Sequence, residues 1–177
     1  MKKTYSTVAV VGGGASGIAA ALTASAVPDR HVLLLERQQR IGRKLLATGN
    51  GRCNLTNQNA APKDYFGTDA SFAKEALSRF TPYDTQAFFS KLGLLTVAEE
   101  SGRIYPLSDS ANSVLDVLRF ALDRAGVEQR CAFPVESVLP SGSGFRLKSG
   151  EKTLYADAVI LACGGAAGAK MGGVMDG

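Results

Sequence analysis

Apolar runs near the N-terminus have two different periods, one typical of a strand and one typical of a helix. Residues 7–11 are short, β-branched and apolar, as in a strand buried on both faces. Residues 15–26 follow three glycines and are rich in alanine, which predicts a tightly packed helix. Residues 32–35 form a second apolar run. This strand–helix–strand order predicts a right-handed crossover and a parallel sheet.

The pattern of the remaining chain predicts a helical excursion at about residues 71–125, followed by more strands. Thr81 and Pro82 are suited to the start of a second helix in this excursion, which the pattern extends to residue 92. Residues 111–125 have one apolar stripe and end before Gly126. Strands are expected at 94–97 and 127–132, a β-hairpin at 145–148 and 153–155, and a buried strand at 158–162.

The segment between the second strand and this excursion has a different character. Residues 37–63 contain six Lys or Arg residues and no acidic residue, and they are rich in Gly and Asn. A long segment without a clear period is commonly functional or disordered. The formal net charge of +4 therefore reflects a local feature.

Composition narrows the class of protein. The 177 residues are 45% hydrophobic and 20% charged, which is ordinary for a globular chain and argues against a disordered or collagen-like one. Three separated cysteines make a disulfide framework unlikely, and a single His leaves little for a transition-metal site. The N-terminal apolar run is too short for a signal peptide or membrane span. We therefore expect a cytoplasmic protein without a metal site.

The glycine turn carries the main chemical signal. Gly12, Gly14 and Gly17 fit the GxGxxG pattern, in which glycines allow a tight turn and a close backbone approach to a pyrophosphate. The pattern alone is weak, but here it follows a predicted strand and opens a predicted helix. Glu36 ends the next strand, where a carboxylate can accept hydrogen bonds from ribose hydroxyls. Together these features predict a dinucleotide site.

The same residues bear on which dinucleotide is bound. Glu36 would repel a 2′-phosphate, which disfavours NADP at this site, whereas NAD and FAD both fit the fingerprint. Two features favour FAD. The basic Gly/Asn-rich segment could lie over a flavin, and small residues at 162–165 let a distant strand approach a nucleotide.

The basic segment also carries a family resemblance. Residues 42–57, GRKLLATGNGRCNLTN, closely resemble the signature of bacterial NAD(P)/FAD-dependent oxidoreductases described as aminoacetone-oxidase-like or BaiN-like flavoproteins. The glycine motif, Glu36-Arg37, residues 101–106 (SGRIYP) and residues 163–165 (CGG) match as well. The resemblance implies a Rossmann-like parallel sheet of the two-dinucleotide-binding flavoprotein type. Members of the family are longer, so it also implies that residues 1–177 are an N-terminal FAD-binding domain, incomplete at its C-terminal end.

The motif and the resemblance together give a set of expected FAD contacts. The pyrophosphate is expected at Gly12, Gly13, Gly14, Ala15, Ser16 and Gly17, the ribose at Glu36, and phosphate or adenosine at Arg37 and Lys44. The flavin is expected near Asn50, Gly51 and Asn54, the adenine at the backbone of Val135, and the pyrophosphate side is lined by Ala162, Cys163 and Gly164. Arg52 is a candidate for stabilising a reduced flavin, and Cys53 is expected to be structural, although nearby cations could lower its pKa.

The function expected from these residues is hydride transfer between FAD and a small organic substrate or NAD(P)H. No paired carboxylates or Ser/His/Asp arrangement emerges, so the catalytic acid or base stays unassigned, as suits chemistry carried by a cofactor. Two alternatives remain open: a non-enzymatic dinucleotide-binding module and an RNA-associated flavoprotein. The basic segment has no aromatic residue to stack on bases, which makes nucleic acid the weaker partner.

Overall fold

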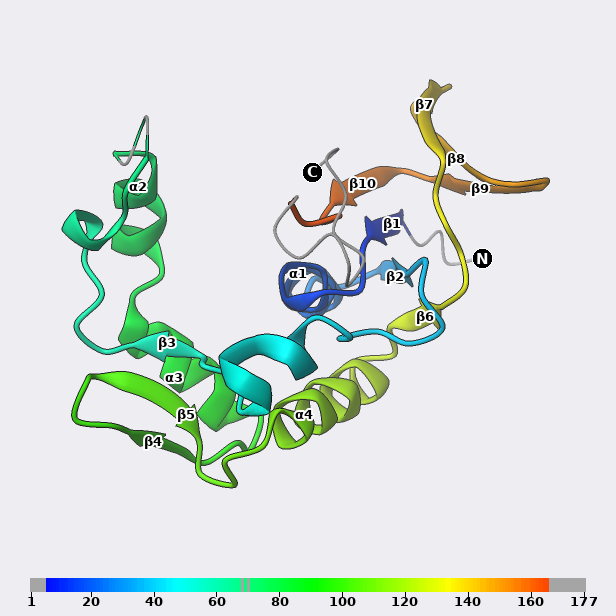
Figure 1. Cartoon of the computed structure of the whole chain (residues 1–177). Coiled ribbons are helices and arrows are strands. Elements are labelled where there is room, and N and C mark those ends of the chain that lie inside the picture. The colour runs from blue at the N-terminus through cyan, green and yellow to red at the C-terminus, as the bar shows by residue number, and fades with distance from the viewer. Residues whose placement is uncertain (1–5, 68, 70, 166–177) are drawn as a thin grey trace. The chain divides into compact units, whose positions relative to one another are not determined.

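The computed structural model describes residues 6–67, 69 and 71–165, and it divides the chain into two compact units. The first unit comprises residues 1–45 and 118–177, and the second comprises residues 46–117. Figure 1 traces both along the chain.

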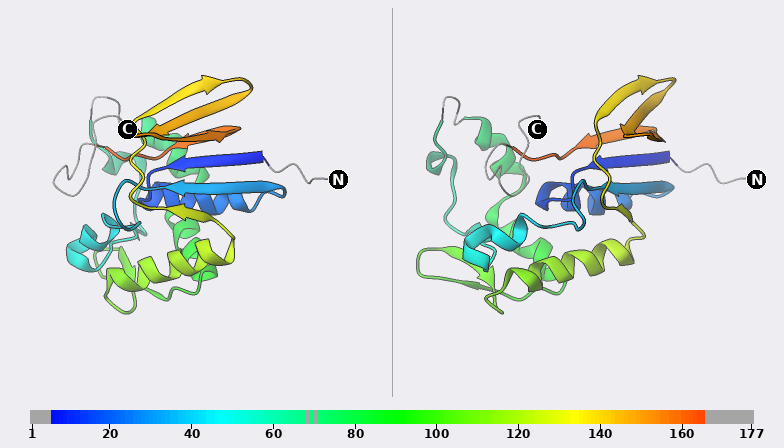
Figure 2. Two further views of the ribbon diagram at one scale, coloured as in Figure 1. Left: turned by 90° about the vertical axis from the view of Figure 1, so that its right-hand side faces the viewer. Right: turned by 45° about the vertical axis from the view of Figure 1, so that its right-hand side comes forward.

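A parallel sheet forms the centre of the first unit. Its strands are β1 (Ser6–Val11), β2 (Arg30–Leu35), β6 (Glu128–Arg130) and β10 (Ala158–Leu161), in the order β10-β1-β2-β6. The helix α1 (Ala15–Ser25) connects β1 to β2 and packs on both strands, as the crossover pattern predicts. The other neighbours in the sheet are also parallel, so all four strands end at one edge (Figure 2).

A second, antiparallel sheet packs against the parallel one. It consists of β7 (Ser137–Ser141), β8 (Gly144–Ser149) and β9 (Lys152–Ala156). The hairpin of β8 and β9 is confirmed, whereas β7 was not predicted because its residues include Pro140 and lack a clear alternation. Burial of apolar side chains from both sheets stabilises this layer. The buried cluster contains Ala9, Val11, Leu33, Leu35, Phe133, Leu147 and Ala156.

The prediction that the last strand is buried was wrong. In β10, Ala158 is exposed and the side chain of Leu161 is 65% exposed. Within the described residues, β10 pairs only with β1 and lies at an edge of the sheet. An apolar run of four residues has the same pattern in a central strand and in an edge strand, so the sequence did not separate the two.

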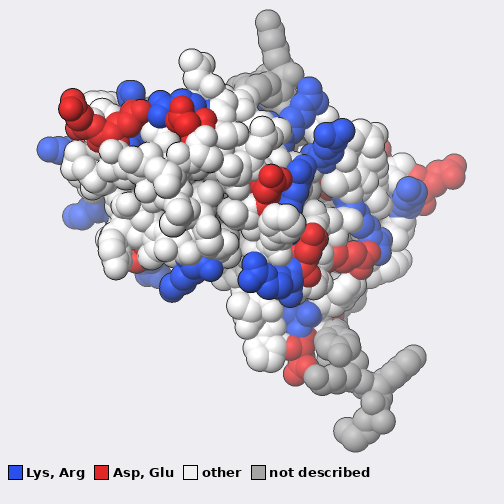
Figure 3. Space-filling model, turned by 90° about the horizontal axis from the view of Figure 1, so that it is seen from below, with Lys and Arg blue, Asp and Glu red and all other residues white. Residues whose placement is uncertain are grey.

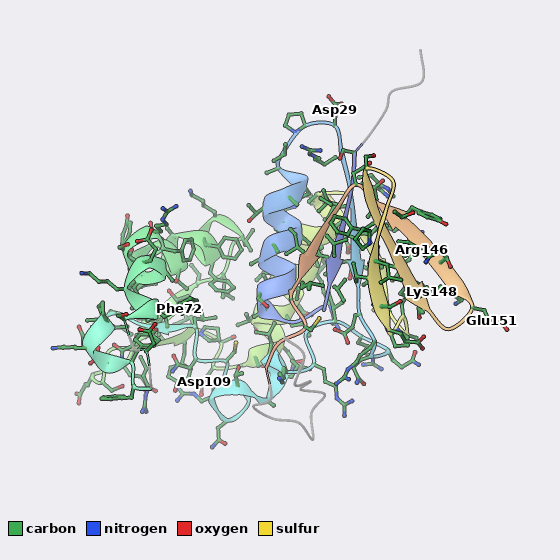
Figure 4. All side chains as sticks on the ribbon, turned by 90° about the horizontal axis from the view of Figure 1, so that it is seen from above. Asp29, Phe72, Asp109, Arg146, Lys148 and Glu151 are labelled. Atoms are coloured by element: carbon green, nitrogen blue, oxygen red, sulfur yellow. The ribbon has the colours of Figure 1, made fainter. Side chains whose placement is uncertain are left out.

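The second unit combines short helices with a small antiparallel sheet. Two 3-10 segments, η1 (Leu45–Gly51, beginning at the last residue of the first unit) and η2 (Pro62–Asp64), flank β3 (Thr56–Asn57). The helices α2 (Phe72–Arg79) and α3 (Pro82–Lys91) follow, and Figure 4 labels Phe72 on α2. The sheet has the order β3-β5-β4, with β4 at Thr96–Ala98 and β5 at Arg103–Pro106. The excursion therefore includes a sheet, of which the sequence predicted only the strand at 94–97, observed as β4.

Local sequence signals fix the ends of the helices in the excursion. The hydroxyl of Thr81 accepts a hydrogen bond from the N–H of Asp84, and the Asp84 carboxylate accepts one from the N–H of Thr81. This reciprocal pair is a capping box at the start of α3. The helix α4 (Ala111–Arg124) crosses from the second unit into the first and buries its predicted apolar stripe, with Leu115 and Leu122 almost inaccessible.

We expect Gly17 to be required for folding and Gly14 to be dispensable for it. A Cβ at Gly17 would lie 1.7 Å from the carbonyl oxygen of Gly12, whereas a Cβ at Gly14 meets no described atom within 4 Å. Gly17→Ala should therefore lower the free energy of unfolding by about 1–3 kcal/mol, as overpacking does. For Gly14→Ala, the free energy of unfolding should change by no more than about 0.5 kcal/mol. The loss of the N-cap preference of glycine lowers it, and the smaller entropy of the unfolded chain raises it by a similar amount.

Urea unfolding of the two variants without added cofactor checks this difference. Equal losses in both variants would contradict the assignment of Gly17 to helix packing and leave the open space at Gly14 without significance.

Candidate functional site

The glycine turn between β1 and α1 is held by close backbone contacts. Gly12 has a φ of 111°, and a Cβ there would lie 2.3 Å from the carbonyl oxygen of Ala162 at the end of β10. A Cβ on Gly17 would also meet the Ala162 side chain at 3.4 Å. The first and third glycines of the motif are thus required by the protein's own packing, which brings β1, α1 and β10 together at one point.

Gly14 differs from these two glycines because nothing in the described structure requires its lack of a side chain. Its φ of −82° and ψ of −171° suit any residue, and the space around its missing Cβ is open. The first hydrogen bond of α1 joins the N–H of Ile18 to the oxygen of Gly14, at 2.9 Å. The N–H groups of Ala15, Ser16 and Gly17 therefore lack partners within the helix.

This helix N-terminus is suited to an anion. The first turn of α1 contains no acidic residue, so the partial positive charge of the helix dipole is not neutralised there. Ala15 and Ser16 are exposed, so a ligand can reach their backbone. Open space at Gly14 beside unpaired amides fits the pyrophosphate of a dinucleotide.

Glu36 points its carboxylate at the glycine turn. Its Oε2 accepts a hydrogen bond from the N–H of Gly13 at 2.7 Å, and its Oε1 accepts one from the N–H of Gln38 at 2.8 Å. Each carboxylate oxygen has two lone pairs, so each can accept a further hydrogen bond from a ribose hydroxyl. Glu36 is thus oriented by the turn before any ligand is bound.

Ile41 is a contributor to the glycine turn that the motif did not reveal. A Cβ on Gly13 would lie 2.8 Å from Cγ2 of Ile41 and 3.0 Å from Oε2 of Glu36. Gly42 also donates a backbone hydrogen bond to the oxygen of Gly13 at 2.7 Å. The segment after β2 therefore folds back onto the turn. The middle glycine is a variable position of GxGxxG, so only the contact with this segment explains it.

Several other residues that the sequence predicts to contact the cofactor lie at the same edge of the sheet. Lys44 Nζ would lie 3.7 Å from a Cβ on Gly164, which brings the basic segment beside the turn after β10. The thiol of Cys163 lies 3.8 Å from the carbonyl oxygen of Val11 and packs against the core cluster. Arg37 is exposed one residue beyond Glu36. This arrangement places a cation and small residues near the helix N-terminus.

Val135 lies in the segment between β6 and β7. Its side chain packs against the core cluster. Within the described chain, neither its N–H nor its C=O bonds to another backbone group, although Phe133 and Glu136 on either side both donate backbone hydrogen bonds. Free backbone groups at this position are available to an adenine edge.

The residues expected near the flavin, Asn50, Gly51 and Asn54, belong to the second unit. Asn50 has φ and ψ of 60° and 36°, Gly51 has a φ of 85°, and the N–H of Arg52 bonds to the oxygen of Gly49 at 3.2 Å. These values fit a type I′ turn, for which Asn-Gly is the preferred pair. All three predicted residues are exposed.

The two residues after this turn, Arg52 and Cys53, are both held within the protein. Arg52 hydrogen-bonds to the carboxylates of Glu99 and Asp109, so its charge is engaged by two acidic side chains. Burial raises the pKa of the Cys53 thiol, against the lowering effect of a hydrogen bond with Thr48. The thiol is 2% exposed, in agreement with its predicted structural role.

Two other kinds of feature, a membrane-spanning helix and a metal cluster, are absent from the described residues. No helix in residues 6–67, 69 and 71–165 is both long enough and apolar enough to cross a bilayer. The same part of the chain contains no cluster of three or more His, Cys, Asp or Glu residues that could hold a metal ion.

Comparisons with known proteins show the family and the fold of this chain. A family model described as the HI0933-like protein Rossmann domain matches residues 6–177. The 3-dehydro-bile acid delta(4,6)-reductase of Clostridium scindens is 44% identical over 166 residues, which cover 93% of this chain and 40% of the relative. The ribosomal RNA dihydrouridine synthase of Escherichia coli is 32% identical over 156 residues, covering 88% and 38%. The chain thus spans about two fifths of these relatives.

A solved structure supports the fold independently of the family. The THI4 protein of Thermovibrio ammonificans superposes with a TM-score of 0.56 at 17% identity, over 87% of this chain and 55% of that one. At this identity the likeness concerns the fold alone. The predicted Rossmann-like parallel sheet is confirmed.

We expect Cys53 to react more slowly with thiol reagents than Cys163, because burial both raises its pKa and blocks access. Labelling with a chromogenic disulfide at neutral pH, followed by mass spectrometry of peptides, measures the order of reaction. Unfolding in urea should remove the difference. Rapid labelling of Cys53 in the folded chain would contradict its assignment as a buried structural thiol.

We expect Glu36→Gln to weaken the turn and cofactor retention together. An amide has one acceptor oxygen and an NH₂ group that only donates, so the NH₂ group would oppose the N–H of Gly13 or of Gln38. The expected loss of unfolding free energy is about 1–3 kcal/mol, the usual cost of an unsatisfied buried donor. Urea unfolding and FAD titration measure the two effects, and a variant with wild-type values for both would refute the role of Glu36.

Proposed function

Because the chain belongs to the HI0933-like family, we propose that it forms the FAD-binding part of a flavoprotein oxidoreductase. The observation that carries the proposal is the open space at Gly14 beside unpaired helix amides and an oriented Glu36. A side chain would fit at Gly14 in the protein alone, and a bound pyrophosphate explains why none is present.

The first unit supplies the groups that would hold the adenosine diphosphate half of FAD. The amides of Ala15, Ser16 and Gly17 would donate to the pyrophosphate, beside Gly12, Gly13 and Gly14. Glu36 would accept from the ribose, and Lys44 and Arg37 would offset phosphate charge. Ala162, Cys163 and Gly164 would line the other side of the pyrophosphate, and the backbone of Val135 would meet the adenine.

The proposed chemistry comes from the cofactor. When bound, FAD supplies hydride transfer to or from a substrate, while the protein orients the ring and adjusts its electrostatics. Asn50, Gly51 and Asn54 remain our candidates for contacts with the polar edge of the flavin. Arg52 is no longer among the candidates for direct charge stabilisation, because two carboxylates hold it.

The proposed substrate is a small organic molecule or NAD(P)H, in a cytoplasmic setting. The likeness to a bile acid reductase at 44% identity supports this class. A second candidate is an RNA-associated flavoprotein, favoured by the 32% identity to a ribosomal RNA dihydrouridine synthase. Figure 3 shows both basic and acidic side chains on one face. The basic segment at residues 37–63 has no aromatic residue to stack on bases, so we rank the RNA candidate second.

We expect the purified chain to retain FAD and Gly14→Ala to lose it. The added methyl group would occupy the space proposed for pyrophosphate, and a forced contact of about 1–3 kcal/mol corresponds to roughly 10- to 100-fold weaker binding. Flavin absorbance after gel filtration and calorimetric titration measure retention and affinity. The same variant should unfold like the wild type, which makes it selective for binding.

Three outcomes would change the proposal. A chain that binds NAD but not FAD would favour a non-enzymatic dinucleotide-binding module. Co-purified nucleic acid that salt removes would favour the RNA candidate. Equal FAD affinity in the wild type and Gly14→Ala would refute the proposed pyrophosphate position.

A further inference from the structure

Arg52 is the centre of a compact charged cluster in the second unit. Its Nη2 donates to Oε1 of Glu99 at 2.8 Å, and its Nε donates to the carboxylate of Asp109, which Figure 4 labels. Its Cζ lies 3.8 Å from the centre of the Tyr105 ring. The guanidinium therefore has one face on an aromatic ring and two donors on carboxylates, a geometry that suits Arg and not Lys.

The charges in this cluster exclude a simple anion site. Two carboxylates and one guanidinium leave a net charge of −1, and hydrogen bonds to Glu99 and then Asp109 raise the pKa of Arg52 above its ordinary value. Arg52 thus stays cationic, and its charge is engaged within the protein. Its side chain is only 33% exposed. These contacts indicate a role in holding structure, not in capturing a ligand.

What Arg52 holds is the type I′ turn at Asn50-Gly51. Arg52 closes the turn through its N–H to Gly49, and Cys53 extends it through its N–H to the oxygen of Thr48 at 3.0 Å. The turn also packs tightly, since a Cβ on Gly49 would lie 2.6 Å from the nitrogen of Asn54 and 3.2 Å from Cε1 of Tyr105. The same ring therefore contacts the guanidinium and limits the space at Gly49.

The turn presents two side-chain amides to solvent. Asn50 and Asn54 are both exposed, and within the described residues neither side-chain amide has a hydrogen-bond partner. Each amide offers two donors and one acceptor oxygen. Side chains on a backbone fixed by several contacts lose less conformational entropy when they bind a planar polar ligand.

We propose that Arg52 is a positioning residue, which fixes the 48–54 turn through Glu99, Asp109 and Tyr105 and so fixes the direction of the Asn50 and Asn54 amides, our candidates for flavin contacts. The second half of this statement rests on the proposed function. The first half concerns the second unit alone. The two halves need separate measurements, and the chain provides a chemical reporter for the first.

The reporter is deamidation of Asn50. The backbone nitrogen of Gly51 attacks Cγ of Asn50, the bond from Cγ to the side-chain nitrogen breaks, and ammonia leaves. Water then opens the cyclic imide to a carboxylate. The attack requires the backbone at Asn50 to leave its ψ of 36°, so an ordered turn slows the reaction. Mass spectrometry of the 45–63 region follows it without any cofactor.

Arg52→Lys keeps the positive charge but removes the forked geometry of the guanidinium. Asp109→Asn removes the negative charge from one of its two partners and so weakens that hydrogen bond. Both should increase the deamidation rate roughly two- to fivefold, the change in open population expected for exposed ion pairs. Arg79→Lys is the matched control. Arg79 donates to Glu75 at 2.6 Å in an exposed pair on α2, away from the turn in sequence. It should leave the deamidation rate unchanged.

The second measurement is the midpoint potential of bound FAD, determined against a reference dye. Asn50→Ala and Asn54→Ala should shift it by removing hydrogen bonds to the ring. Arg52→Lys should shift it in the same direction by misdirecting those amides, and Arg79→Lys should not. A change of global stability alone would not shift the potential of the flavin that remains bound.

The outcomes separate the inference from the function on which it rests. An unchanged deamidation rate in Arg52→Lys overturns the inference. Faster deamidation with an unchanged potential, while the Asn variants shift it, overturns the positioning role. If the Asn variants do not shift it either, the assignment of these amides to the flavin is wrong. A chain that binds no FAD refutes the proposed function, while the deamidation rates still decide whether Arg52 holds the turn.

Discussion

The close approach of α1 to the ends of β1 and β10 is the constraint on which the candidate site depends. Gly12 and Gly17 allow it, because a Cβ at either position would overlap backbone atoms. The contact with Ala162 brings the end of the last described strand to the first turn, although 150 residues separate Ala162 from Gly12 along the chain. Without this approach, the helix amides and the turn after β10 would not share one edge of the sheet.

Glu36 connects this constraint to recognition. Its carboxylate spans from the end of β2 to the amide of Gly13, so the same hydrogen bond stabilises the turn and orients an acceptor for a sugar. Ile41 and Gly42 then fold back onto Gly13 and limit the space on that side. Structural and binding roles are therefore combined in Glu36, while Gly14 has a role that the protein's own packing does not explain.

The second unit uses a different means of ordering its polar residues. The first unit places its groups with a sheet and a helix, whereas the 48–54 turn has little regular structure and depends on an Arg–carboxylate–Tyr cluster. Such clusters contribute little to global stability when exposed. They can still select one conformation of a short turn, which is the property that a positioned pair of amides needs.

The sequence by itself determined the strand–glycine turn–helix unit, the position of Glu36, the helix start at Thr81 and the buried stripe of α4. Each depends on residues near one another in the chain, so a local pattern is sufficient. Tertiary structure alone decided that Arg52 is neutralised, because Glu99 and Asp109 lie 47 and 57 positions away. It likewise decided that β10 is an edge strand and that Gly13 meets Ile41. Contacts between distant segments determine burial and charge pairing, and no local period records which segments will meet.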